Sequence, residues 1–291
     1  MKDYILFGDC RDSLKIIANE EEKVRMCVTS PPYYGLRDYG GEESQIGLEQ
    51  TPEEFIDELV KVFREVRNVL EDDGTCWVNI GDSYYNYRPG KGQGLAKQSV
   101  SNTKQDLPDV CPRRGNKLEG LKEKDLIGIP WMFAFAMRAD GWYLRQDIIW
   151  NKPNPMPESV KDRCTKAHEY IFLFSKSQNY YFDVDAIKEP TRRKRSVWNV
   201  QVRPYKGSHF AVYPPDLIEP CIKAGSEEGD IVLDPFMGSG TTAMVAKSLG
   251  RDYIGCELHE DYGNLIQQRV EEYQPVNQLA QEPTINILDL I

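Results

Sequence analysis

The sequence predicts an α/β fold with a mostly parallel sheet and helices on both of its faces. Short apolar segments of strand type alternate with segments of helical spacing along most of the chain, which is the pattern of a doubly covered sheet. Near residue 240, a strand, a Gly-x-Gly turn and a helix follow one another directly. The 291 residues, of which 40% are hydrophobic, are enough for the core of such a fold.

The predicted elements follow in chain order. Strands are expected at residues 4–7, 24–29, 75–80, 143–150, 170–174, 231–233 and 253–256. Helices are expected at residues 12–18, 52–73, 129–139, 214–224 and 241–249. The second helix has the clearest start, because Thr51 is a good cap and Pro52 suits the first turn. Its apolar spacing continues to Leu70, and Asp73-Gly74 is expected to end it. Residues 87–123 lack any periodicity and are predicted to form a long loop.

The composition argues against several classes of protein. No apolar run approaches the roughly 20 residues that span a bilayer, so we expect no membrane association. The seven cysteines are scattered, odd in number and never arranged as Cys-x-x-Cys. This indicates a reducing cytoplasm and argues against a disulfide framework. With only three histidines as well, we predict no metal site.

Basic residues gather in two stretches, 88–124 and 188–206, although the net charge of the chain is −10. A charge run is usually a solvated face, but two basic loops on an acidic chain favour a polyanionic partner. The residues expected to contact it are Arg113, Arg114, Arg192, Arg193, Lys194 and Arg195.

The tetrapeptide Ser30-Pro31-Pro32-Tyr33 follows the second predicted strand. Two adjacent prolines fix two φ angles and remove two backbone donors, so the turn is stiff and leaves carbonyl oxygens available. A hydroxyl precedes the prolines and an aromatic ring follows them, an arrangement that suits a flat molecule carrying an NH2 group. The alternative is a rigid turn with no further role.

A second motif spans residues 234–242, Asp-Pro-Phe-Met-Gly-Ser-Gly-Thr-Thr, between a strand and a helix. Gly-x-Gly at this point lets a cofactor approach the backbone at a helix N-terminus. Glu257 closes the next strand, close to the spacing of a ribose-binding carboxylate. The third glycine of the dinucleotide motif is absent, which weakens the case for NAD and favours S-adenosylmethionine, a nucleoside cofactor without a pyrophosphate.

Together the two motifs resemble the beta class of DNA amino-methyltransferases. In that class a Ser/Asp/Asn-Pro-Pro-Tyr/Phe motif precedes an Asp-Pro-Phe-x-Gly-Ser-Gly-Thr-Thr motif, as residues 29–33 and 234–242 do here. The resemblance extends over residues 4–272, with 87–123 as the unmatched part. It implies a Rossmann-like S-adenosylmethionine-dependent methyltransferase fold with a circularly permuted motif order, which leaves the core contacts in place.

The resemblance also implies roles for individual residues. Those expected at the reacting amine are Ser30, Pro31, Pro32 and Tyr33. Those expected around S-adenosylmethionine are Asp9, His209, Phe210, Asp234, Phe236, Gly238, Ser239, Gly240, Thr241, Thr242 and Glu257. We expect Trp150, Tyr170 and Phe172 to pack in the core rather than to line the pocket of the target base.

The implied activity is site-specific methylation of the exocyclic amine of a base flipped out of double-stranded DNA. Serine at position 30 favours cytosine N4 over adenine N6, which stays as the alternative. An RNA methyltransferase and a DNA-binding module with a decayed core are less favoured. Methylation at cytosine C5 would require a nucleophilic cysteine after proline, and Pro220-Cys221 lies instead in a predicted amphipathic helix.

We divide the chain into three core parts and three other segments. The core parts are residues 1–86, 125–185 and 207–275, the last holding the cofactor motif. Residues 87–124 form a basic insertion expected to contact DNA, 186–206 a basic recognition segment and 276–291 a tail. A cognate restriction endonuclease and a second copy of the chain are open as further partners.

Overall fold

A computed structural model describes residues 2–20, 23–35, 45–86, 117–203 and 213–273. Its centre is one eight-stranded sheet of order β1-β8-β7-β2-β3-β5-β4-β6. The strands are β1 Tyr4–Phe7, β2 Val24–Thr29, β3 Leu70–Ile80, β4 Tyr143–Asn151, β5 His168–Ser175, β6 Val197–Asn199, β7 Ile231–Asp234 and β8 Asp252–Glu257. All neighbouring pairs are parallel except the two that β5 makes with β3 and β4.

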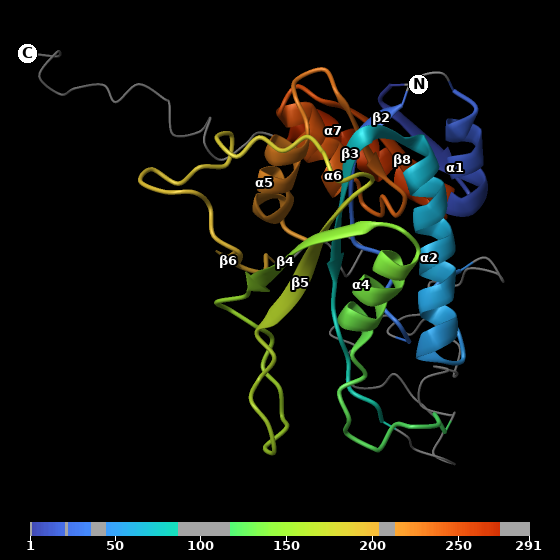
Figure 1. The fold of residues 1–291 in the computed structure, drawn as a ribbon, viewed down its shortest axis with the longest axis vertical. Coiled ribbons are helices and arrows are strands. Elements are labelled where there is room, and N and C mark those ends of the chain that lie inside the picture. Colours follow the sequence, from blue (N-terminus) through green and yellow to red (C-terminus); the bar gives the residue numbers. More distant parts are fainter. Residues whose placement is uncertain (1, 21–22, 36–44, 87–116, 204–212, 274–291) are drawn as a thin grey trace, which may run out of the picture.

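Helices cover both faces of this sheet (Figure 1). On one face lie α1 Cys10–Ala18, α2 Pro52–Val69 and α4 Ile129–Ala139. On the other lie α5 Pro215–Gly225, α6 Thr241–Ser248 and α7 Gly263–Glu272. A short 3-10 turn, Glu260–Tyr262, precedes α7. The predicted α/β class and mostly parallel sheet are therefore confirmed.

The alternation of side chains along β2 explains how both layers form. Cys27 packs with the helices α1, α2 and α4, whereas Met26 and Val28 pack with α5 and α6. All three side chains are at most 2% exposed. A strand that is apolar on both faces is expected at the centre of a parallel sheet. This central position of β2 brings its carboxyl end beside that of β7, which carries the second motif.

The predicted end of the second helix is wrong. The helix ends at Val69, and Leu70 already has an extended backbone and pairs with Val24 of β2. Residues 71–74 form an irregularity in β3, after which the pairing resumes between Met26 and Thr75. Leu70 is fully buried as the first residue of β3, and an apolar residue at that spacing suits a buried helix position as well as a buried strand position.

Two elements were not predicted. The first is β6, a three-residue edge strand beside β4 that lies within the basic segment 186–206. The second is α7, which packs against α6 through the buried Ile266. Strands from residues 1–86, 125–185 and 207–275 all enter the one sheet. Residues 87–116 and 276–291 lie outside the described part of the chain. No helix within the described ranges is long and apolar enough to cross a membrane.

Candidate active site

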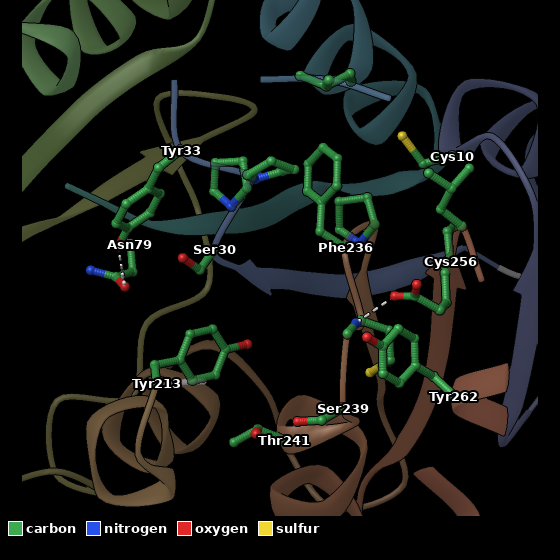
Figure 2. A pocket seen from close by; sticks show the side chains of 18 of the residues that line it. Cys10, Ser30, Tyr33, Asn79, Tyr213, Phe236, Ser239, Thr241, Cys256 and Tyr262 are labelled. Atoms are coloured by element: carbon green, nitrogen blue, oxygen red, sulfur yellow. Dashed lines mark hydrogen bonds between the residues drawn. The ribbon is translucent and has the colours of Figure 1, made fainter. Parts of the chain in front are cut away.

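A cavity of about 420 Å³ opens where the parallel strands end (Figure 2). Gly8 follows β1, Ser30 follows β2, Pro235 follows β7 and Leu258 follows β8, and all four line the cavity. Ligands of open α/β sheets bind in this crevice outside the carboxyl ends of the strands. The fold thus brings the two sequence motifs to one space.

One end of the cavity is formed by the tetrapeptide, and Ser30, Pro31, Pro32 and Tyr33 all line it. The hydroxyl of Tyr33 donates to Glu169 Oε2 over 2.7 Å, which holds the ring in place. Gly81 makes room for that ring, because a Cβ there would lie 2.6 Å from the Tyr33 ring.

Glu169 is the centre of a polar group at this end. Its Oε2 also accepts a hydrogen bond from Asn79 Nδ2 over 3.2 Å, and its Oε1 contacts the ammonium of Lys152. That ammonium lies 4.2 Å from the centre of the Trp150 ring. Asn79, Trp150, Lys152 and Glu169 all line the cavity. The expectation for Trp150 was therefore wrong, because it lines the cavity, whereas Tyr170 does not line it and Phe172 is fully buried in the core, as expected.

The other end of the cavity carries carboxylates at the ends of β1 and β8. Glu257 Oε2 accepts the backbone N–H of Gly238 over 2.8 Å, and its Oε1 accepts that of His259 over 3.0 Å. Burial raises the pKa of Glu257 to about 7, and these two hydrogen bonds oppose the shift.

Asp9 caps α1 by accepting the backbone N–H of Arg11 over 2.8 Å. Burial acts to raise the pKa of Asp9, but the hydrogen bonds and charge of Arg11 outweigh it and hold that pKa below its ordinary value. Asp9 is therefore ionised near neutral pH. Arg11 balances its charge through a salt bridge of 2.5 Å, so Asp9 and Glu257 place two carboxyl groups, one of them paired, at this end of the cavity.

The Gly-rich loop between β7 and α6 is held in place by the helix α7. Gly240 has φ +82°, and a Cβ there would lie 2.7 Å from Ile266 of α7, so glycine is required. Arg269 of α7 donates to the carbonyl of Ser239 over 2.6 Å and to Thr241 Oγ1 over 3.2 Å. The unpredicted helix α7 thus shapes the predicted loop.

A buried carboxylate, Asp234, joins the two motifs. It accepts hydrogen bonds from Thr29 Oγ1 at 2.6 Å, Thr242 Oγ1 at 2.5 Å, Tyr213 OH at 3.1 Å and the Phe236 N–H at 3.0 Å. Burial raises the pKa of Asp234, and the four donors counteract this. Asp234 is 1% exposed and Thr242 is fully buried, so both support the cavity wall without lining it.

The predicted cofactor residues therefore divide into groups. Those that line the cavity are Asp9, Phe236, Gly238, Ser239, Thr241 and Glu257. Asp234, Gly240 and Thr242 stand behind its wall. His209 and Phe210 lie outside the described residues, as do Arg113 and Arg114 of the basic insertion.

The basic residues of the segment before β6 do not line the cavity. Arg192 pairs with Glu189 over 2.5 Å, and Lys194 lies 4.9 Å from the centre of the Trp198 ring. Arg192, Arg193 and Arg195 are exposed, and they precede the sheet edge formed by β6.

Sequence reasoning missed the side chains that the fold alone brings to the site. They are Asn79, Lys152, Glu169, Arg269 and His259. Cys10 also lines the cavity, and burial raises its pKa to about 12. Cys221 is fully buried within α5, burial raises the pKa of its thiol, and it does not line the cavity, which counts against carbon-5 chemistry.

Comparisons with known proteins agree with this geometry. The N6_N4_Mtase family model, described as DNA methylase, matches residues 24–268. The Type II methyltransferase M.XycI of Xanthomonas campestris pv. cyanopsidis is 51% identical over 253 residues, which cover 85% of this chain and 81% of that protein. The Type II methyltransferase M.SmaI of Serratia marcescens is 48% identical over 278 residues, which cover 91% and 90%.

Solved structures share the fold. The PvuII DNA methyltransferase, described as cytosine-N4-specific, has a TM-score of 0.67 at 20% identity and covers 96% of this chain and 92% of its own. The M1.HpyAVI–SAM complex has a TM-score of 0.60 at 19% identity and covers 92% and 98%. The family match and the relatives together show that this chain belongs to the DNA methylase family of N6/N4 amino-methyltransferases.

Proposed function

We propose that this chain transfers a methyl group from S-adenosylmethionine to N4 of a cytosine flipped out of double-stranded DNA. The observation that carries the proposal is a single cavity with two chemically different ends. Ser30 lies between Asn79 on one side and Phe236 on the other (Figure 2). A methyl donor at one end and an amine at the other would therefore meet beside the Ser30 hydroxyl.

The residues at the second end fit S-adenosylmethionine. The buried carboxylate of Glu257 offers acceptors for ribose hydroxyls, and the ring of Phe236 offers an apolar surface for a base. His259 Nε2 is buried at the cavity with no hydrogen-bond partner among the described residues, so a polar ligand would satisfy it. The volume of about 420 Å³ is within the usual range for cofactor sites.

The carboxyl groups at this end also offer oxygen atoms to a sulfonium cation. Asp9 and Glu257 both line this end, and Asp9 keeps a pKa below its ordinary value. Bound there, S-adenosylmethionine supplies a methyl group attached to a positively charged sulfur. The sulfur leaves readily because it becomes a neutral thioether. Positioning and local electrostatics then carry most of the catalysis.

The residues of the tetrapeptide would make the amine more nucleophilic and orient it. The amine of cytosine is a poor nucleophile because its lone pair is delocalised into the ring. Hydrogen bonds from the NH2 to the Ser30 hydroxyl and the Pro31 carbonyl favour a tetrahedral nitrogen and direct the lone pair towards the cofactor end. The nitrogen–carbon bond forms as the carbon–sulfur bond breaks, and the amine then releases one proton to water. The Tyr33 ring, held by Glu169 and Gly81, provides a stacking face for the base.

Cytosine is proposed over adenine because the first residue of the tetrapeptide is serine. A structural neighbour described as cytosine-N4-specific supports the same choice. The Type II names of the relatives support a restriction-modification context, with a cognate endonuclease as the expected partner. Contact of residues 192–195 with DNA phosphates and a homodimeric state stay predictions.

Incubation with labelled S-adenosylmethionine and separate DNA and RNA, followed by nucleoside mass analysis, tests the proposal. We expect N4-methylcytosine in DNA, and sequencing of the labelled DNA then gives the recognition site. Detection of N6-methyladenine instead would show that the target base is adenine. Label found in RNA alone would show that the substrate is RNA and not DNA. Ser30→Ala should abolish transfer but keep DNA and cofactor binding. A wild-type chain that binds DNA without transferring label would indicate a decayed core.

A further inference from the structure

A partly buried ion pair faces the cavity at the end that receives the base. Lys152 follows β4 and Glu169 lies in β5, and their side chains are only 18% and 15% exposed. Removing two charges even partly from water carries a desolvation cost, which the pair's attraction repays only in good geometry. The proposed function gives Glu169 the part of holding Tyr33 and gives Lys152 no part. The position of Lys152 at the cavity therefore calls for a function.

The carboxylate of Glu169 is already committed to the protein. It accepts hydrogen bonds from Lys152 at one oxygen and from Tyr33 and Asn79 at the other. These donors come from three different segments of the chain, so Glu169 fixes them relative to one another. Glu169 is therefore a positioning residue, and the group left to meet a ligand is the ammonium.

The ammonium of Lys152 has donors to spare. An ammonium carries three N–H groups, and the hydrogen bond that the described residues give it goes to Glu169. The face of Trp150 holds it from a second side at 4.2 Å, and Trp150 is itself anchored by its N–H to the Val200 carbonyl over 2.8 Å. Two strong donors are thus held at a fixed place on the cavity wall.

We propose that Lys152 donates to N3 and O2 of the flipped cytosine and so determines which base the enzyme accepts. This inference rests on the proposed function, because it presumes a base whose amine lies at Ser30. On cytosine, N3 and O2 follow the amine along one edge, so they present two adjacent acceptors. On adenine, N1 follows the amine, and the next position is a C–H group that cannot accept. An ammonium with two free donors therefore suits cytosine better.

An enzyme–substrate cycle tests this contact. A duplex with the mapped recognition site is prepared with cytosine or with 3-deazacytosine, which lacks the N3 acceptor, at the target position. Each duplex is methylated by the wild type and by Lys152→Met, so intrinsic differences in amine reactivity cancel between the enzymes. The cytosine preference is the ratio of kcat/KM for the cytosine duplex to kcat/KM for the 3-deazacytosine duplex. This ratio should be about 10- to 100-fold larger for the wild type than for Lys152→Met, as expected for a lost hydrogen bond to a charged group.

Lys166→Met is the matched control. Lys166 is also close enough to Glu169 to interact electrostatically with it, but it does not line the cavity. This variant should keep the wild-type preference. Glu169→Gln should lower kcat/KM for both duplexes but keep a dependence on N3, because the ammonium is still present. If Lys152→Met fails to bind cofactor in a calorimetric titration, Lys152→Gln takes its place in the same cycle, with an intermediate preference expected.

Equal preferences in the wild type and Lys152→Met would overturn the inference. If the wild type still forms N4-methylcytosine in that case, the proposed function stands. A wild type that forms no N4-methylcytosine would refute the proposed function itself, and this result is obtained before any Lys152 variant is measured.

Discussion

Replacement of Thr29 by valine removes one hydroxyl from the hydrogen bonds around Asp234 and keeps the shape of the side chain. Thr29 is 1% exposed, and its Oγ1 lies 2.6 Å from Asp234 Oδ1. Loss of a hydrogen bond to a charged group costs about 1.5–3 kcal/mol, so we expect the free energy of unfolding to fall by about 2 kcal/mol. Urea unfolding followed by circular dichroism measures this change.

The same substitution should weaken cofactor binding. Asp234 Oδ1 also accepts the N–H of Phe236 over 3.0 Å, so a carboxylate that turns would shift the start of the cofactor loop. If about half of the lost energy appears in binding, the Kd rises about fivefold. Isothermal titration with S-adenosylhomocysteine, the reaction product, gives this value.

Thr75→Val is the matched control, because Thr75 is fully buried and its Oγ1 accepts the indole N–H of Trp77 over 3.1 Å. It leaves a buried donor without a partner, which costs about 1–3 kcal/mol, so both variants should lose similar stability. Only Thr29→Val should lose cofactor affinity. An unchanged Kd in Thr29→Val, or an equal change in Thr75→Val, would refute the reasoning.

Three further outcomes are expected. Burial raises the pKa of Glu257 to about 7, and ribose hydroxyls donate best to its charged form, so the affinity for S-adenosylhomocysteine should fall as the pH drops below 7. Glu257→Gln should bind weakly at every pH, and a retained pH dependence would contradict this assignment. Gly81→Ala would place a Cβ 2.6 Å from the Tyr33 ring, so kcat/KM should fall about 10- to 100-fold with little change in cofactor Kd. Alanine at residues 192–195 should flatten the plot of log K for DNA binding against log salt concentration, by about 0.9 in slope for each lost phosphate contact. Replacement of the exposed Lys15 by alanine should leave this slope unchanged.

Local signals were sufficient for most of the fold. The strand, Gly-x-Gly turn and helix around residue 240 are adjacent in sequence, so pattern alone located them. The direction of β5 was not predictable in this way, because the run Ile171, Phe172, Leu173 and Phe174 is buried whichever way the strand points. The helix α7 was missed because its single buried residue, Ile266, gives almost no periodicity.

The candidate site was predictable only where its residues form a motif. Lys152 and Glu169 meet because β4 and β5 run antiparallel and pair Trp150 with Glu169. Nothing in the spacing of 17 residues indicates that contact. Arg269 likewise reaches Ser239 from a helix whose position depends on tertiary packing. Sequence reasoning therefore located the two motifs that line the cavity but not the side chains that hold them.

The hydrogen bonds of Asp234 have a consequence for how enzymes of this type can vary. Thr29 joins the two motifs through its hydrogen bond to Asp234. Ser30, the next residue, forms no side-chain hydrogen bond with the described part of the chain. The hydrogen bond that joins the motifs and the proposed contact with the amine thus belong to neighbouring side chains. A change at the first residue of the tetrapeptide should therefore leave the hydrogen bonds of Asp234 in place. Redesign of the accepted base can therefore begin at Ser30 and leave Thr29 untouched.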